Sequence, residues 1–315
     1  MLSSHLLNVL CNRLRYKHLV MLVTLGNSLN MHRASEALNV SQPAATRMLQ
    51  EIEAAFDCEL FERFNRGMRP TAIGLEIIRF AQTALNGLER CSEDIVRFQK
   101  GGFGHLTIGT IMGAAPSLVI ETIAEIKRLR PRLHITISGD TSDQLIEQLE
   151  LGKIDVAIGR RSLLGSRSHF SFEPLSNEKL IAVVHSAHPL LQQPELDIAD
   201  VVNHWPWILQ PVSSPARYAI EQYLRRLDLP TPTDVTECSS VFAMLQLIQI
   251  TDAVMILSES VLVDYLRMGL IRELPIAVDA HLEPFGILMR DDEPLSRELD
   301  IFLSLLRQRA RPPQP

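Results

Sequence analysis

Residues 41–63, SQPAATRMLQEIEAAFDCELFER, carry the clearest pattern in the first part of this chain. Ser41 is placed to cap a helix, and Pro43 falls in its first turn, where a missing N–H group costs nothing. The buried face of this helix is predicted from apolar residues at helical spacing, Ala45, Leu49, Ile52 and Phe56. Donors, acceptors and small apolar groups suited to base edges in a major groove remain on the outer face: Gln42, Ala44, Thr46, Arg47 and Gln50.

Two shorter helices are predicted before this one. Apolar residues recur at helical spacing from Lys17 to Leu25, and Gly26 is expected to end that helix. Asn30 is placed to cap a second helix. Its expected inward residues are Met31, Ala34, Ala37 and Leu38. With Val40 closing the turn, the three segments predict a helix-turn-helix.

A basic hairpin is predicted after the third helix, at residues 61–71, with a tight turn at Asn65, Arg66 and Gly67. Its tip is expected to enter a flanking minor groove, while Thr71 caps the next helix. Residues 1–50 carry five basic residues against one acidic residue, although the whole chain has a net charge of −6. This asymmetry favours an anionic partner for the front of the chain; by charge alone, a chance excess on a solvated face is an equal alternative.

These patterns predict a surface that binds double-stranded DNA. The predicted contacts are Arg33, Ser41, Gln42, Pro43, Ala44, Thr46, Arg47, Arg66 and Arg69. The alternative is an ordinary helical bundle with a polar, solvated face.

Residues 17–75 resemble the DNA-binding domain of LysR-type transcriptional regulators. The resemblance is carried by Arg33-Ala34, Leu38, Val40 to Arg47, Glu53, Leu60 to Arg63, Arg66-Gly67, Thr71 and Gly74. The chain departs from the family pattern at Ser35, Thr46, Asp57 and Pro70, where the family often has Ala, Ser, Gly and Leu. Thr46 keeps the hydroxyl group, whereas Pro70 puts in question how the hairpin meets the following helix.

A long helix is predicted to follow Thr71. Its apolar positions resemble a coiled-coil seam: Leu75, Ile78, Ala81, Leu85, Leu88 and Ile95. The seam predicts dimerisation, and a two-fold dimer would present two recognition helices to an inverted repeat. Gly101, Gly102 and Gly104 then predict a hinge.

The remainder alternates between strands and helices, which favours a parallel sheet. The expected strands are 106–110, 133–138, 154–159, 180–184, 253–257 and 286–289, and the expected helices are 117–130, 142–151, 215–227, 239–250 and 294–308. Two lobes joined by two crossovers are predicted. This part resembles, more loosely, the effector-binding domain of the same family, itself similar to periplasmic solute-binding proteins. The residues that best carry this resemblance are Gly152 to Gly159 and His188-Pro189-Leu190.

The predicted fold class is therefore α+β multidomain, with a mainly α winged helix-turn-helix, a linker helix and a two-lobed α/β effector domain. The expected boundaries are 1–15 for an extension without assigned role, 16–74 for the winged helix-turn-helix, 75–100 for the linker and 101–315 for the effector domain. Within the last, lobe I is expected at about 104–175 and 281–312, and lobe II at about 176–280.

A ligand in such folds binds beyond the carboxyl ends of strands, near helix N-termini. The predicted effector contacts are Thr110, Met112, Thr141, Ser142, Arg160, Ser213 and Ser214, with Arg160 as a cation at the rim. For each hydroxyl group, a plain helix cap or loop contact is an equal alternative.

Other classes of protein are disfavoured. No apolar run approaches the roughly 20 residues needed to cross a bilayer, and no cleavage site follows the basic N-terminus, so we expect a cytoplasmic protein. The four cysteines are scattered, which favours reduced thiols. His185 and His188 have no third ligand placed by the sequence, and Ser176-x-x-Lys179 lacks its partner motifs. We therefore expect no catalytic residue, no metal and no cofactor, and we interpret Trp205 and Trp207 as packing residues.

The sequence is thus identified as that of a LysR-type regulator, a homodimer or homotetramer that responds to a small-molecule inducer. The family resemblance implies contact with RNA polymerase and control of a catabolic or transport operon. A solute-binding or transport-accessory protein with an oligomerising N-terminal bundle is the alternative, and an enzyme is the third possibility. The inducer, the target genes and the balance of activation and repression stay open.

Overall fold

A computed structural model describes residues 12–64, 67–99, 104–114, 118–161, 170–291 and 295–310. They fall into two compact units. The first contains the described residues up to His105 together with Glu147–Asp155, and the second contains Leu106–Ile146 and the described residues from Val156 onward. Within the described ranges, no helix is both long and apolar enough to span a membrane.

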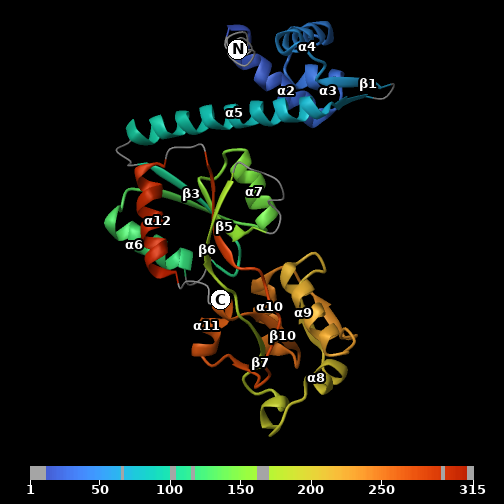
Figure 1. Cartoon of the computed structure of the whole chain (residues 1–315), viewed down its shortest axis with the longest axis vertical. Helices are drawn as coiled ribbons and strands as arrows, with labels where there is room; N and C mark the ends of the chain where they lie inside the picture. Colours follow the sequence, from blue (N-terminus) through green and yellow to red (C-terminus); the bar gives the residue numbers. More distant parts are fainter. Residues whose placement is uncertain are drawn as a thin grey trace. The chain divides into compact units, whose positions relative to one another are not determined.

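The first unit begins with three helices, a two-stranded hairpin and a long helix (Figure 1). These elements are α2 (Tyr16–Ser28), α3 (Met31–Ala37), α4 (Gln42–Phe56), β1 (Phe61–Phe64), β2 (Gly67–Pro70) and α5 (Ala72–Gln99). The expected end of the first helix at Gly26 is wrong, because α2 continues to Ser28. A Cβ atom at Gly26 would lie 3.1 Å from the side chain of Ile78, so this glycine permits close packing of α5 on α2.

The helix-turn-helix prediction is confirmed in the cap at Asn30, and it is corrected in the cap at Ser41, whose side chain makes no cap hydrogen bond among the described residues, and in the buried face. Asn30 Oδ1 accepts the backbone N–H groups of His32 at 2.9 Å and Arg33 at 3.2 Å, as a helix cap does. Ala34 is buried as expected, but Ala37 is exposed and Ser35 is buried in its place. The Ser35 hydroxyl donates to the carbonyl oxygen of His32 at 2.7 Å, which satisfies this polar group inside the core.

The hairpin is held in place by contacts that the sequence does not reveal. β1 and β2 pair antiparallel, with Phe64 opposite Gly67; Asn65 and Arg66 lie outside the described residues. Glu53 Oε1 accepts the N–H of Leu60 at 2.9 Å, which ties α4 to the start of the hairpin. Thr71 Oγ1 accepts the N–H of Gly74 at 2.9 Å, so the predicted cap of α5 is confirmed.

Helix α5 carries apolar residues on two different faces. Ile78 and Ala81, predicted as seam positions, instead pack into the core that α5 forms with α2 and α4. A second set of apolar side chains is about half exposed: Ile73, Leu75, Phe80, Leu88 and Ile95. The predicted single seam is therefore corrected, because the core of the same chain takes some of its members.

The second part of the chain contains two five-stranded sheets, each flanked by helices (Figure 1). The elements of lobe I are β3 (His105–Thr110), α6 (Ile120–Leu129), β4 (His134–Gly139), α7 (Ser142–Glu150), β5 (Val156–Arg160), β6 (Phe170–Ser176), β12 (Phe285–Arg290) and α12 (Arg297–Arg309). Its strands follow the order β4-β3-β5-β12-β6. The expected helix starts at Ser117 and Pro294 lie outside the described residues.

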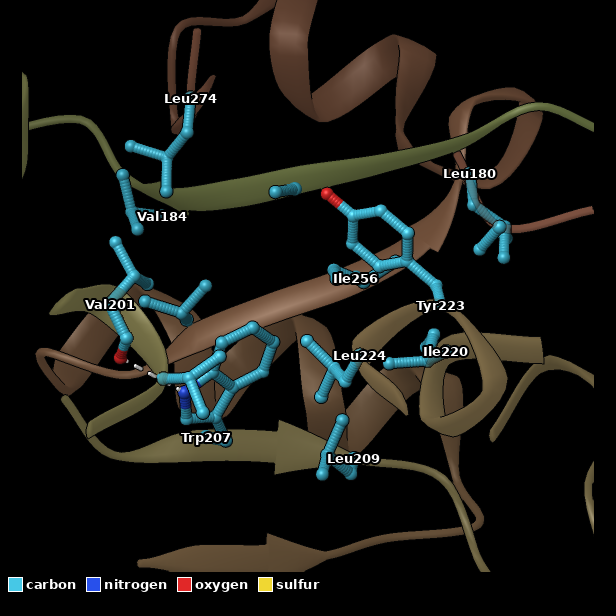
Figure 2. Close-up of a cluster of buried hydrophobic side chains, with 14 of the residues drawn as sticks. Leu180, Val184, Val201, Trp207, Leu209, Ile220, Tyr223, Leu224, Ile256 and Leu274 are labelled. Atoms are coloured by element: carbon cyan, nitrogen blue, oxygen red, sulfur yellow. Dashed lines mark hydrogen bonds between the residues drawn. The ribbon is translucent and has the colours of Figure 1, made fainter. Parts of the chain in front are cut away.

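Lobe II contains the elements between the two crossovers. These are β7 (Leu180–His185), η2 (Pro189–Gln192), α8 (Ile198–His204), β8 (Trp207–Leu209), α9 (Pro215–Arg226), β9 (Val235–Glu237), α10 (Val241–Ile250), β10 (Val254–Ser258), α11 (Glu259–Arg267) and β11 (Ile271–Glu273). Its strands follow the order β11-β7-β10-β8-β9. In its core, shown in Figure 2, Trp207 is fully buried and its Nε1 donates to the Val201 carbonyl oxygen at 3.3 Å, which confirms its packing role.

The expectation of a purely parallel sheet is wrong for both lobes. β3 pairs parallel with β5, but β12 runs antiparallel to β5 and β6. In lobe II, β8, β9 and β10 are parallel, whereas β7 is antiparallel to β10 and β11. The antiparallel strands are those next to the crossovers, where the chain passes from one sheet to the other. Several elements were not predicted: the strand β6 of seven residues, the short strands β8, β9 and β11, and the helices α8 and α11.

Candidate functional site

The predicted recognition surface is present on α4. Gln42, Ala44, Arg47 and Gln50 are exposed, and Thr46 is half-buried. The opposite face buries Ala45, Leu49, Ile52 and Ala55 in the core, with Phe56 half-buried. Ser41 and Pro43 are exposed at the start of α4, but among the described residues the Ser41 side chain makes no cap hydrogen bond.

A cavity of about 400 Å³ lies between the start of α3, the start of α4 and the hairpin. It is lined by Asn30, Met31, His32, Gln42, Thr46, Arg63, Phe64, Gly67 and Met68. A winged protein places its recognition helix in one groove and its hairpin in the next, so one DNA backbone must pass between the two elements. We therefore include this cavity in the proposed DNA-binding surface.

The remaining predicted DNA contacts surround this surface. Arg33 on α3 and Arg69 on β2 are exposed, and Arg66 lies outside the described residues. Arg63 and Phe64 also line the cavity, although neither is among the predicted contacts. The signal for Arg63 was its place in the basic predicted hairpin, whereas the sequence held no signal for Phe64.

The predicted effector residues are brought together only in part. Ser142 Oγ, at the start of α7, accepts the backbone N–H of Arg160 at 2.9 Å, so these two residues are neighbours. Thr141 is exposed beside them, and its hydroxyl donates to Gln144 Oε1 at 2.9 Å. The Thr110 side chain is buried and donates to the carbonyl oxygen of Ile111 at 3.1 Å, so it faces the interior of lobe I rather than a cleft.

The other predicted effector residues lie on loops. Met112 is 40% exposed on the loop after β3. Ser213 is exposed before α9, and the Ser214 hydroxyl donates to the side chain of Gln210. Ser214 therefore stabilises its own loop and makes no side-chain cap to α9 among the described residues.

Arg160 was predicted as a cation at the rim of the effector site, and its environment in the structure differs most from the prediction. Its side chain is 10% exposed and forms an ion pair with Glu178, whose side chain is 9% exposed. Arg160 Nε also donates to the carbonyl oxygen of Glu283 at 3.1 Å. Glu178 and Glu283 lie on the two chain segments that connect the lobes. The side chain of Arg160 therefore contacts both crossovers. The prediction was wrong because the sequence did not place Glu178 beside it.

A larger cavity, which the sequence analysis missed, lies at these crossovers. It has a volume of about 650 Å³, within the range of small-molecule sites. Its described lining residues are Gly113, Leu118, Glu121, Ser176, Asn177, Glu178, Lys179, Ser258, Glu259, Ser260, Val263, Phe285, Arg309 and Ala310. None of the seven predicted effector residues is among them. We call this space the hinge cavity.

In the structure, Asp252 lies beside His185 and His188 as a third potential metal ligand, which the sequence did not place. Donor atoms of His185, His188 and Asp252 lie within 4.8 Å of one another. However, the Nδ1 atoms of His185 and His188 accept backbone N–H groups at 3.2 and 3.1 Å, and their Nε2 atoms face Asp252 oxygens at 2.9 and 3.1 Å. With both nitrogens engaged, each ring acts as a turn-forming residue, and a metal would have to displace these bonds.

The cysteines fit the expectation of reduced thiols where the structure describes them. Cys58, Cys91 and Cys238 are free thiols, and Cys11 lies outside the described residues. Burial raises the pKa of the Cys58 thiol, so this group is less nucleophilic than an ordinary cysteine.

Known proteins resemble this chain over nearly its whole length. Residues 16–75 match the bacterial regulatory helix-turn-helix family of lysR type, and residues 99–311 match the LysR substrate binding domain. The HTH-type transcriptional regulator GbpR of Azospirillum brasilense is 35% identical over 296 residues, covering 94% of this chain and 86% of that protein.

Two solved structures have a similar fold. A full-length OxyR variant from Pseudomonas aeruginosa has a TM-score of 0.61 at 22% identity, covering 95% of this chain and 97% of that chain. Full-length CbnR in complex with its target DNA has a TM-score of 0.62 at 20% identity, covering 94% of this chain and 100% of that chain.

Proposed function

This chain belongs to the LysR family of DNA-binding transcriptional regulators, and we propose that it binds an inverted-repeat operator as a dimer or tetramer and responds to a small metabolite. The family consists of regulators, and the relatives that match this chain are transcriptional regulators rather than enzymes. In the proposed scheme, the protein acts in the cytoplasm on a catabolic or transport operon.

The exposed face of α4 carries the DNA-binding part of the proposal. Gln42 and Gln50 offer both donors and acceptors to base edges, and Arg47 offers a charged fork for a base or phosphate. The neighbouring cavity, with Arg63 on its wall, suits the sugar-phosphate backbone between the two grooves. CbnR, a protein with the same fold, is solved in complex with its target DNA, and this complex supports DNA binding by the present chain.

The exposed apolar stripe on α5 supports the oligomer. Ile73, Phe80, Leu88 and Ile95 are each more than half exposed and recur at intervals of seven or eight residues. Helices with such a stripe pair with a second helix to remove it from water. A second copy of this chain is the proposed partner, and its symmetry would match an inverted repeat.

The sensor part of the proposal places a metabolite among the residues Met112, Thr141, Ser142, Ser213 and Ser214, with Arg160 positioning Ser142. A ligand with higher affinity for one arrangement of the lobes would shift the protein toward that arrangement. The shift would change the spacing of the DNA-binding units and their contact with RNA polymerase.

Genome-wide capture of DNA bound by the tagged protein, followed by footprinting of the strongest site, tests the proposed function. We expect an inverted repeat near a catabolic or transport operon. An Arg47→Ala protein, captured in parallel, should lose that enrichment. Absence of enrichment for the unmodified protein in every growth condition would contradict the proposal.

A second experiment addresses the sensor. Thr141→Val together with Ser142→Ala should leave operator binding intact and abolish the response to the metabolite that the captured operon identifies. An undiminished response would place the effector site elsewhere in the chain.

A further inference from the structure

The hinge cavity is built from three parts of the chain. Lobe I supplies the start of α6, the end of α12, Ser176 at the end of β6 and Phe285 at the start of β12; lobe II supplies α11, and the first crossover supplies Asn177 to Lys179. A molecule bound in this space would therefore touch both lobes. Its occupancy would favour the lobe arrangement in which the cavity has this shape.

The charged side chains of the cavity wall are paired with one another or with close neighbours. Arg309 donates to Glu121 at 3.0 Å, and Lys179 lies 3.6 Å from Glu259. Glu178 is paired with Arg160, as described above. The Arg160–Glu178 pair is about nine-tenths buried, so a charged ligand that displaced either partner would leave an uncompensated buried charge. An uncharged ligand avoids this cost.

Paired carboxylates still have hydrogen-bonding capacity. Each carboxylate has about four lone-pair positions, and a guanidinium has five N–H donors, so one ion pair leaves several of them unused. Glu121, Lys179 and Glu259 are exposed, which places them at the mouth of the cavity. The wall is thus rich in donors and acceptors that a ligand with several hydroxyl groups can use.

The deeper wall combines hydroxyl groups with an apolar surface. Ser258 is 3% exposed and its Oγ lies 2.9 Å from Ser260 Oγ, which in turn donates to the carbonyl oxygen of Gly113 at 2.6 Å. Leu118 and Phe285 are also buried in the wall. A ligand with hydroxyl groups on its edge and C–H groups on its face matches such a surface.

We propose that the hinge cavity is a binding site for an uncharged polyhydroxylated molecule of monosaccharide size. This site goes beyond the predicted effector residues, none of which lines it. Binding itself does not depend on the DNA-binding function, and only its consequence for transcription rests on the proposed function.

Calorimetric titration of the full chain with the D-aldohexoses and with the corresponding aldonates tests the ligand class. We expect at least one sugar to bind, and its aldonate to bind about tenfold more weakly or worse, a difference of roughly 1.4 kcal/mol. A result in which no sugar binds, or in which the aldonates bind better, would overturn the proposal.

Two variants on α11 test the location. Val263 lines the cavity, and Val263→Phe should fill it and reduce sugar affinity about tenfold or more. The neighbouring Asp264 is exposed and is not among the described lining residues, so Asp264→Phe should leave the affinity unchanged. Equal affinities in the two variants would place the sugar elsewhere and overturn the proposal.

A third variant tests the argument from paired charges. Glu178→Gln keeps the shape of the side chain but removes a carboxylate from the cavity wall, so the aldonate should gain affinity relative to the sugar by about tenfold. If the ratio of aldonate affinity to sugar affinity did not change, the role of Glu178 in excluding anionic ligands would be contradicted. Operator binding of the same preparations is measured separately, so a failure of DNA binding with intact sugar binding would reject only the proposed regulator function.

Discussion

The guanidinium of Arg160 is paired with the carboxylate of Glu178, and both side chains are about nine-tenths buried. The two residues lie at the end of β5 and on the first crossover between the lobes. Because Arg160 also donates to Glu283 on the second crossover, a single side chain links lobe I to both connections. The two residues are only 18 positions apart, but no local pattern in the sequence predicts their contact.

Loss of one partner of this pair should destabilise the effector domain strongly. Arg160→Met leaves the Glu178 carboxylate buried without its cation, and we expect a loss of about 3 kcal/mol in the free energy of unfolding, measured in urea. The double variant Arg160→Met, Glu178→Met should recover much of this loss, because it buries no uncompensated charge. Additive effects of the two substitutions would show that the pair is not coupled.

Replacement of two glycines on α5 by alanine should have opposite effects on the stability of the protein. A Cβ atom at Gly74 would lie 2.0 Å from the carbonyl oxygen of Leu60, so Gly74→Ala should destabilise the first unit by about 2 kcal/mol. Nothing lies within 4 Å of a Cβ atom at Gly87, where Gly87→Ala should stabilise the helix by up to about 1 kcal/mol. Thermal unfolding of the two variants measures both effects. Equal changes in the unfolding temperature would rule out the steric explanation.

Removal of Arg47 should weaken operator binding without affecting folding. If Arg47 contacts a phosphate, Arg47→Ala lowers affinity for all sequences and reduces the salt dependence by about one unit of slope. If it contacts a base, the loss is about 1–3 kcal/mol and is confined to the cognate site. Arg267→Ala, an exposed change in lobe II, is the control and should bind normally. Titrations at several salt concentrations distinguish these cases, and normal binding by Arg47→Ala would remove it from the contact surface.

A charge on the exposed stripe of α5 should break the oligomer. Leu88 is 55% exposed, and Leu88→Glu would place a carboxylate in the proposed helix pair, so we expect monomers in sedimentation experiments. Operator affinity should fall about a hundredfold, because the second half-site is no longer bound by a tethered partner. Glu89→Ala, on an adjacent exposed position, should remain oligomeric. A Leu88→Glu protein of unchanged mass would mean that the stripe has another partner.

His188 should make lobe II sensitive to acid. Burial holds the pKa of His188 below its ordinary value, because the folded protein favours the neutral ring. The stability it contributes is therefore present above the unfolded pKa of about 6.5 and is lost as the pH falls further. His188→Asn keeps an acceptor for the turn and should flatten this dependence. The only two tryptophans, Trp205 and Trp207, lie in lobe II, so their fluorescence during unfolding at several pH values measures it. An equally steep acid dependence in the variant would assign the effect to another group.

The local features of this protein were predictable from the sequence. The cap at Asn30, the outward face of α4 and the cap at Thr71 each depend on residues within a few positions of one another. Hydrogen bonds and side-chain spacing over such short distances are fixed by helix geometry, which the sequence displays directly. The resemblance to the LysR family rested on these same local patterns.

Gly26 is a residue for which the local sequence pattern predicted a helix end wrongly. Taken alone, a glycine after an apolar run predicts the end of a helix. In the structure Gly26 lies inside α2, because Ile78, more than fifty residues later, packs against it. Likewise, Ile78 and Ala81 matched a coiled-coil seam by spacing, but the chain itself covers them.

The helices of the first unit, the long helix α5 and the alternation of strands and helices follow from short-range periodicity, and the resemblance to the LysR family implies their arrangement as a DNA-binding unit and a sensor. The pairing of charges and the position of a cavity depend on the tertiary structure. Asp252 meets His185 across 67 positions, and Ser260 reaches Gly113 across 147. Contacts between such distant residues depend on how the two sheets pack and cross, and no local pattern in the chain records that arrangement.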